Sequence, residues 1–438
     1  KSPLDAQDQL GAGKAVDPEI TLDAAIWLDL DETAALRMQL ADKVAHQHDQ
    51  VAAKFDIVQL SIHKVLPRSP DVSGIDQNQS VGLQWAYCLR PKPRDVFVTV
   101  KFGGVRAEPR RCHVMRDQAN LHADRRSLRL FLCGDVMCGR GIDQVLEHPC
   151  SPEIYEDYMR SAEDYVRLAE QVNGPIPRRN RPSYVWGAAL EQLERMKPDA
   201  RIINLETAVT RSNDYMHKGI NYRMSPENAG CLRVARIDCC TLANNHVLDW
   251  GRAGLDETLA TLQELDIKVA GAGHNQAEAR APAVLSLRKA RILVFSLGVP
   301  SSGVPVEWAA KGNAAGVNLL HDLSRASALV LVEQIIALRR PGDLVVVSIH
   351  WGSNWGYHIP DEQVSFARTL IDDAGVSIVH GHSSHHPRPL EVYRDRLILY
   401  GCGDFLNDYE GIRGYERYRD DLTLMYFADL DPSSGELH

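Results

Sequence analysis

The chain has 438 residues, of which 44% are hydrophobic and 24% are charged, and its formal net charge at pH 7 is −9. This composition is typical of a globular protein and excludes a fibrous or broadly disordered chain, while the length favours two domains. The negative charge argues against general nucleic-acid binding, which usually depends on a basic surface.

The first 127 residues contain no motif that predicts chemistry. Residues 1–20 lack periodicity and are expected to form a flexible arm, whereas apolar positions recur at helical spacing over residues 22–55. We therefore predict a small α+β domain of unknown role over residues 21–127, which ends in a charged, turn-rich stretch. The strand-like stretches of this domain are Phe55–Ile62, Gly82–Leu89 and Val96–Phe102.

Residues 128–438 show a different pattern, in which strands, loops and helices alternate. Such alternation predicts a layered α/β fold with ligands at the carboxyl ends of the strands. The expected strands are Leu128–Cys133, Ala200–Leu205, Cys239–Ala243, Lys268–Ala270, Arg291–Leu297, Leu344–Ile349, Val376–Val379 and Leu397–Tyr400. The helical stretches between them include Gly254–Leu265, Ala326–Leu338 and Glu362–Asp373.

Five short polar motifs come at the ends of these predicted strands. They are GDVM at 134–137, NLE at 204–206, NNH at 244–246, HWG at 350–352 and GHSSH at 381–385. Carboxylate, amide and imidazole groups are thus delivered repeatedly to one edge of a sheet. Rigid strand ends that carry such a mixture of ligands are suited to binding divalent metal ions.

The two carboxylates each follow an apolar strand. Asp135 is placed in a glycine-flanked turn after the first strand of this region, and Glu206 follows the next one. Either residue alone is equally consistent with an ordinary strand-terminating turn. Their recurrence at equivalent positions favours a pair of metal ligands.

The NNH motif combines an amide and an imidazole. Asn244 and Asn245 could simply form a turn, but the pair precedes His246, and Asp249 follows three residues later. A coherent interpretation is an asparagine ligand, a histidine general acid and an aspartate that fixes the histidine tautomer.

Histidines crowd the last two motifs. His350 ends a very apolar strand and is followed by a tryptophan; it could be a buried histidine bound to a backbone carbonyl, but its position favours a site. His382 and His385 form a plausible ligand pair, with His380 and His386 beside them.

Cysteine usage and hydropathy say little about location. The nine cysteines are odd in number and contain no C-x-x-C pair, which slightly favours a reducing compartment. No apolar run approaches the roughly 20 residues needed to cross a bilayer. We expect a soluble protein and slightly favour the cytoplasm, although the absence of an initial methionine leaves a preceding signal or anchor open. The sequence does not determine the oligomeric state.

The motifs, in this order, resemble those of the CapA family, the poly-γ-glutamate capsule synthesis proteins, which are similar in turn to calcineurin-like metallophosphoesterases. The resemblance covers roughly residues 128–430. The blocks that carry it are GDVMCGRG, INLETAVT, TLANNHVLDWG, SIHWGSNW and GHSSHHPRPLEVYRDRLILYGCGDFLND.

The resemblance implies a four-layer αββα metallophosphoesterase-like domain with one or two divalent transition metal ions, for which Mn, Fe and Zn are equally suitable. It further implies that His246 is the proton donor and that Arg140 contacts an anionic substrate. The implied metal ligands are Asp135, Glu206, Asn245, His350, His382 and His385.

The chain departs from the pattern of these families at three places. A calcineurin-like first motif has a histidine two residues after the aspartate, where this chain has Met137. The HWG block commonly continues to a glutamate, where Asn354 stands, and the usual GNF reads as glycine, Asp404 and phenylalanine. Asp404 could replace the missing ligand or simply end a strand.

Two functions are compatible with these residues. In a metal-dependent hydrolase, a metal-bound hydroxide would attack a phosphoester or a γ-glutamyl-type amide of an anionic small molecule or polymer. Alternatively, the protein is a non-catalytic capsule component that binds, assembles or exports the polymer, within a membrane-associated capsule complex.

Overall fold

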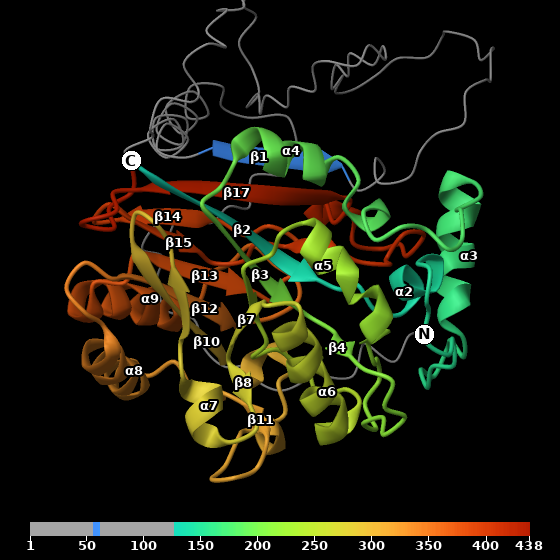
Figure 1. Cartoon of the computed structure of the whole chain (residues 1–438), viewed down its shortest axis with the longest axis horizontal. Coiled ribbons are helices and arrows are strands. Elements are labelled where there is room, and N and C mark those ends of the chain that lie inside the picture. Colours follow the sequence, from blue (N-terminus) through green and yellow to red (C-terminus); the bar gives the residue numbers. More distant parts are fainter. Residues whose placement is uncertain (1–55, 62–126) are drawn as a thin grey trace, which may run out of the picture.

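The computed structural model of the chain describes residues 56–61 and 127–438, in which two β-sheets pack face to face and helices cover both outer faces (Figure 1). The first sheet has seven strands in the described residues, in the order β1-β17-β2-β3-β6-β7, with β16 beside β2. Strands β2, β3, β6, β7 and β16 are parallel to one another. Strand β17 is antiparallel to both of its neighbours, β2 and the edge strand β1. Their bounds are β1 Asp56–Ser61, β2 Leu128–Val136, β3 Ala200–Leu205, β6 Cys239–Thr241, β7 Lys268–Ala270, β16 Asp404–Leu406 and β17 Leu422–Leu430.

The second sheet has six strands in the described residues, in the order β14-β15-β13-β12-β10-β9. Its four central strands are parallel and its two edge strands are antiparallel. The bounds are β9 Ala283–Ser286, β10 Arg291–Gly298, β12 Leu344–His350, β13 Ile378–His382, β14 Leu390–Tyr393 and β15 Arg396–Leu399. Two small pairs complete the strands, β4 (Ala208–Val209) with β5 (Arg223–Met224) and β8 (Ala272–Gly273) with β11 (Gly316–Val317).

Eight α-helices of the described residues surround the sheets. They are α2 Gly141–Val145, α3 Ala162–Asn173, α4 Ala189–Met196, α5 Gly230–Val234, α6 Gly251–Glu264, α7 Gln276–Arg280, α8 Arg325–Leu338 and α9 Asp361–Ala374. Helices α4, α5 and α6 cover the outer face of the first sheet, and α8 and α9 cover that of the second, as Figure 1 shows.

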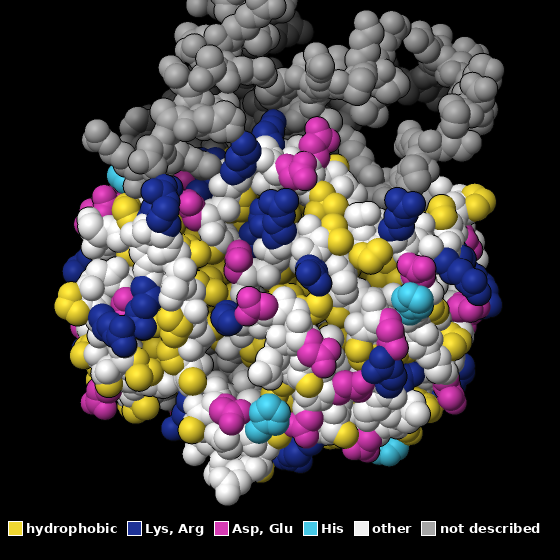
Figure 2. Space-filling view, viewed as in Figure 1, with side chains coloured by type: hydrophobic (Ala, Val, Ile, Leu, Met, Phe, Trp, Pro, Cys, Tyr) yellow, Lys and Arg dark blue, Asp and Glu magenta, His cyan; other side chains and the backbone are white. Residues whose placement is uncertain are grey.

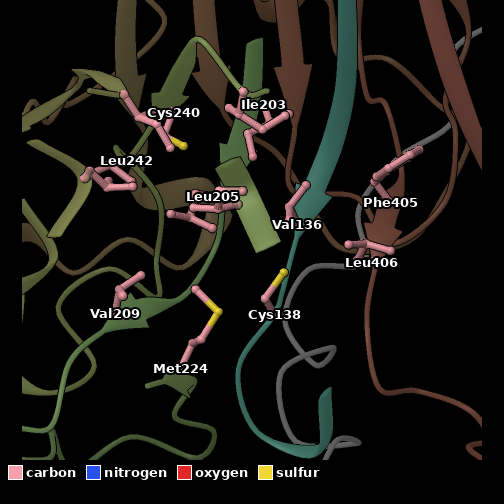
Figure 3. Packing of buried hydrophobic residues seen from close by; sticks show 14 of the residues in the cluster. Val136, Cys138, Ile203, Leu205, Val209, Met224, Cys240, Leu242, Phe405 and Leu406 are labelled. Atoms are coloured by element: carbon pink, nitrogen blue, oxygen red, sulfur yellow. The ribbon is translucent and has the colours of Figure 1, made fainter. Parts of the chain in front are cut away.

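The alternation of side chains along the strands explains this layering. In β2, Leu130 and Leu132 point into the interface between the sheets, whereas Phe131 and Cys133 point toward the helices. Figure 3 shows part of the outer cluster, in which Ile203 and Leu205 of β3 pack with Val136 of β2 and Cys240 of β6. Because both faces of the parallel strands are buried, their sequences are apolar almost throughout.

The predicted layered α/β fold of parallel strands is confirmed. Strands β3 and β7 have the expected bounds, and the other predicted strands differ by a few residues at their ends. Of the predicted N-terminal domain, the structure describes only β1, which pairs with β17 of the first sheet. The expected arm, the helical stretch and the other two strands lie outside the described residues, so that domain stays a prediction.

One local prediction was wrong. Asp135 was expected in a turn after the strand, but β2 continues to Val136 and Asp135 pairs with Asn204 of β3 and Asp404 of β16. Gly134 permits this, because a Cβ atom there would lie 1.7 Å from the carbonyl oxygen of Gly403. Close backbone approach at a glycine thus brings Asp135 and Asp404 side by side.

The surface in view in Figure 2 carries interspersed basic and acidic side chains, with no broad basic area. In the part of the chain that the structure describes, no helix combines the length and apolar character needed to span a lipid bilayer. The seven cysteines in the described residues are free.

Candidate metal centre

The ends of strands from both sheets bring three buried potential ligands together. Asp135 of β2, His350 of β12 and His382 of β13 each offer a ligand atom, and these atoms lie within 4.8 Å of one another. All three side chains are almost fully buried. Two imidazoles and a carboxylate form a donor set that suits divalent transition metals such as Mn, Fe and Zn.

The two imidazoles face each other at the centre of the cluster. The Nδ1 atoms of His350 and His382 are 2.7 Å apart. The Oγ atom of Ser348 lies 2.8 Å from Nε2 of His382 and 3.2 Å from Nδ1 of His380, whose Nε2 lies 2.8 Å from the Cys133 carbonyl oxygen. Ser348 therefore orients the His382 ring, as a hydrogen-bonding partner behind a metal ligand commonly does.

Two further predicted ligands lie beside His350. The Oδ1 atom of Asn245 is 2.9 Å from Nε2 of His350, and Oε1 of Glu206 is 3.9 Å from the same nitrogen. The structure thus brings Asp135, Glu206, Asn245, His350 and His382 into one cluster. Their role as metal ligands stays a prediction.

The protonation states of the residues in the cluster are compatible with a bound cation. Burial lowers the pKa of His350 and His382 well below the usual range, so both imidazoles are neutral, as metal ligands must be. Burial and then Asp404 raise the pKa of Asp135 to about 7, and burial followed by Asp135 raises that of Glu206. A positive charge between these buried carboxylates would reduce the electrostatic repulsion between them.

His385 lies next to this cluster in a different pairing. Its Nδ1 atom is 3.1 Å from Oδ1 of Asp404, which also accepts a hydrogen bond through Oδ2 from Asn407. Burial lowers the pKa of His385, but Asp404 and then Asp135 outweigh burial and raise it. Asp135 therefore stands between two groups, one formed by His350 and His382 and the other by His385 and Asp404.

His246 lies against Asp249, and its predicted role as proton donor stays a prediction. Its Nδ1 atom is 2.7 Å from Oδ2 of Asp249, and its Nε2 atom is 3.9 Å from Oε1 of Glu206. Burial lowers the pKa of His246 to about 4, although Asp249 opposes this. Because a carboxylate accepts only, the neutral imidazole donates Nδ1–H to Asp249 and leaves Nε2 free to accept a proton.

Lys218 is a site residue that the sequence analysis missed. Its Nζ atom is 2.6 Å from Oδ1 of Asp249 and also donates to the carbonyl oxygen of Asn245. It places a positive charge 3.3 Å from Nδ1 of His246. The residue lies in an irregular loop without periodicity, so no local sequence signal marks it.

Arg140 lies outside the cluster. Its guanidinium is buried, with Nε and Nη2 donating to Asp408 at 2.8 and 2.5 Å and Nη1 donating to Glu156 at 2.8 Å. The charge also lies 3.6 Å from the ring centre of Tyr165 and 4.6 Å from that of Tyr222. These contacts favour a structural role, and the predicted contact with substrate stays a prediction.

Asparagine side chains connect the ligands from behind. Nδ2 of Asn204 donates to Asp135 Oδ1 at 2.7 Å and to Glu206 Oε2 at 3.1 Å, and its own Oδ1 accepts from Asn244 at 3.1 Å. Oδ1 of Asn244 accepts from the backbone nitrogens of His246 and Val247. Asn244 is therefore a support for the NNH turn, while Asn245 faces His350.

Comparison with known proteins identifies the family. A family model described as "Bacterial capsule synthesis protein PGA_cap" matches residues 129–409. The chain belongs to this family. The predicted resemblance to the CapA proteins is thereby confirmed.

Relatives in the capsule synthesis family carry related names. A "Probable polyglutamine synthesis accessory protein" of Mycobacterium tuberculosis is 48% identical over 311 residues, which cover 70% of this chain and 82% of that protein. The "PGA biosynthesis protein CapA" of Bacillus subtilis is 28% identical over 299 residues, or 67% of this chain and 66% of that protein.

One solved structure, the crystal structure of a novel phosphatase from Mycoplasma pneumoniae, covers 71% of this chain and 91% of its own chain. Its TM-score is 0.39 and its sequence identity is 14%, so this likeness is too weak to support an inference.

Proposed function

We propose that the chain is a metal-dependent hydrolase with a metallophosphoesterase-type domain, acting on an anionic substrate in capsule polymer metabolism. The observation that carries the proposal is the buried cluster of Asp135, His350 and His382, which joins the carboxyl ends of strands from both sheets. Two further predicted ligands, Asn245 and Glu206, lie beside His350, and His385 lies beside Asp404 next to Asp135.

Divalent ions bound here would supply Lewis acidity toward a phosphoester or amide oxygen and would lower the pKa of a water molecule. The residues that would hold such ions are His350, His382 and Asn245 on one side of Asp135 and His385 and Asp404 on the other. Asp135 and Glu206 would contribute further carboxylates.

His246 would transfer a proton to the leaving group. Its Nδ1–H is held by Asp249, and Lys218 fixes Asp249 in turn, so the imidazole has one orientation with Nε2 on the side of Glu206. From that position Nε2 would take a proton and deliver it to the leaving group of a bound substrate. Asp249 and Lys218 would position this histidine without contacting the substrate.

The names of the relatives suggest the substrate class. Proteins described as capsule, PGA and polyglutamine synthesis proteins are consistent with a γ-glutamyl-type amide in a polyanionic chain, and the metal chemistry is equally consistent with a phosphoester. We propose that an anionic polymer or its fragments are the substrate, within a capsule complex associated with the membrane.

Replacing His246 by alanine tests the proposal. The variant is expected to keep its metal content and to lose turnover of γ-glutamyl amides or phosphoesters by about 10²- to 10⁴-fold, the contribution of a positioned acid or base. His274→Ala, at an exposed histidine, is the matched control and should retain activity. Unchanged turnover in the His246 variant would contradict the assignment.

A second candidate function is polymer binding without catalysis. Met137 stands where a calcineurin-like site has a histidine, and His385 forms an ion pair with Asp404, so the second group resembles a standard metal site less closely. This alternative predicts binding of the polymer with no hydrolysis. Multiple turnovers that His350→Ala removes would exclude it.

A further inference from the structure

A polar cavity lies near the end of the sheets that carries the candidate metal centre. It has a volume of about 220 Å³ and lies between α7, β11 and the segment that follows the short 3₁₀ turn at Val306–Trp308. Figure 1 shows α7, β8 and β11 grouped at the lower edge of the molecule. Its lining residues include three basic side chains, Arg280, Lys311 and His321. None of the described residues that line it carries a carboxylate.

Two basic groups of this cavity, Arg280 and Lys311, have no carboxylate partner in the described residues. Within residues 127–438, none of the three side chains forms a hydrogen bond or an ion pair with a carboxylate. Asp322 accepts hydrogen bonds from Ser324 and Ser327 and also interacts electrostatically with its neighbour His321, so the charge of His321 is partly compensated. Glu278, the closest acidic residue to Arg280 in sequence, accepts a hydrogen bond from Asn275 and contacts His274. Uncompensated positive charge around a concave surface attracts anions.

The cavity is connected to the candidate metal centre by backbone pairing. Gly298 at the end of β10 pairs with His350 on one side and forms a parallel bridge with Leu319 on the other. Leu319 and the adjacent Asn318 line the cavity. Because neighbouring strands lie about 4.8 Å apart, this wall lies about 10 Å from the backbone of His350.

A second link runs through Lys218. Its Nζ atom lies 5.1 Å from the ring centre of Trp308, directly before Ala309 and Ala310, which line the cavity. This contact, like the strand pairing, places the cavity near Asn245 and His246.

We propose that this cavity is an anion-binding subsite, in which Arg280 and Lys311 hold a carboxylate group of a polyanionic substrate. The inference rests on the proposed function, since it assigns the metal centre to the reacting part of the same molecule. Arg280 suits a carboxylate through its planar pair of donors, and Lys311 adds a second charge. The subsite explains how a chain with repeated carboxylates is held in register.

Direct binding tests the subsite. The probe is a fluorescently labelled γ-linked glutamate oligomer, and its dissociation constant is measured by anisotropy for wild type and for Arg280→Gln/Lys311→Gln. The matched control, Arg181→Gln/Arg233→Gln, removes the same charge from exposed residues that do not line the cavity. Inorganic phosphate added as a competitor shows whether a phosphate group occupies the same subsite.

We expect the cavity variant to bind about tenfold more weakly, as the loss of two partly exposed ion pairs implies, and the control to stay within about twofold of wild type. The difference should shrink at high ionic strength because the pairs are screened. Equal binding by wild type and the cavity variant would overturn the proposal, as would a wild type that does not bind the oligomer.

The same measurement in a His350→Ala/His382→Ala background separates this proposal from the hydrolase. A tenfold effect of the cavity substitutions that persists there supports the subsite even if no variant shows turnover. If turnover occurs and the cavity substitutions leave both binding and KM for the oligomer unchanged, the subsite is refuted and the hydrolase stands.

Discussion

Replacing Arg140 by methionine removes a charge on which two other buried charges depend. The guanidinium is 1% exposed, and its partners Asp408 and Glu156 are 6% and 0% exposed. Three donors bind these carboxylates at 2.5 to 2.8 Å, so the variant leaves two buried carboxylates without a cation. Removing one partner of a buried ion pair costs about 3–5 kcal/mol, and we expect the free energy of unfolding to fall by that amount.

Urea unfolding followed by circular dichroism measures this change as a shift of the midpoint at a constant slope. Adding Glu156→Gln and Asp408→Asn to the variant should recover much of the loss, because no buried charge is then left unpaired. Arg233→Met, at an exposed arginine, is the control and should change stability by no more than about 0.5 kcal/mol. A loss below about 1 kcal/mol for Arg140→Met would refute the reasoning and would favour the original prediction that Arg140 contacts substrate.

Two further predictions concern the cluster itself. Ser348→Ala removes the hydroxyl that orients His382, and calorimetric titration with Mn²⁺ or Zn²⁺ should show about 10- to 100-fold weaker binding; unchanged affinity would contradict the orienting role. In metal-stripped protein, Asp135→Asn should gain stability relative to wild type by about 2–3 kcal/mol between pH 5 and pH 8. In the folded wild type the pKa of the Asp135 carboxyl is raised to about 7. The stability that the wild type has at low pH is therefore lost as the pH rises toward that value, whereas the variant does not lose it. A difference that does not depend on pH in urea unfolding would exclude the raised pKa.

The strands that the sequence predicted best are those buried on both faces. Residues 344–350 are apolar almost without interruption because β12 lies between two other parallel strands, with the first sheet on one side and helices on the other. Strand β17 was missed, since it belongs to no strand–helix repeat. It pairs antiparallel with β1 and β2, whose positions in sequence are distant.

The same distinction applies to the site. The proximity of Asp135, Glu206, Asn245, His350 and His382 could be anticipated because each comes at the end of an apolar strand, and parallel strands meet at one edge. The contacts of Arg140 could not be predicted, because its partner Asp408 is 268 residues away in sequence. Lys218 could not be predicted for a related reason. It contacts Asp249 from an irregular loop, and only the tertiary fold brings the two residues together.

Asp404 is an intermediate case. The sequence left open whether this residue replaces a ligand or ends a strand, and the structure places it in β16, paired with Asp135 and bound to His385. Its position depends on Gly134, where a Cβ atom would clash with the carbonyl oxygen of Gly403. A pairing between strands so far apart in sequence is decided by such packing and not by local pattern.

The central claim is that Asp135, His350 and His382 hold a divalent metal ion, and metal content per chain tests it most directly. Elemental analysis of protein purified without added metal should be made for wild type and for His350→Ala/His382→Ala, with His274→Ala as the control for loss of an exposed histidine. The account predicts one to two transition-metal ions per chain in wild type and control, and loss of metal in the double variant. No metal in wild type, even after reconstitution with Mn²⁺, Fe²⁺ or Zn²⁺, would contradict it.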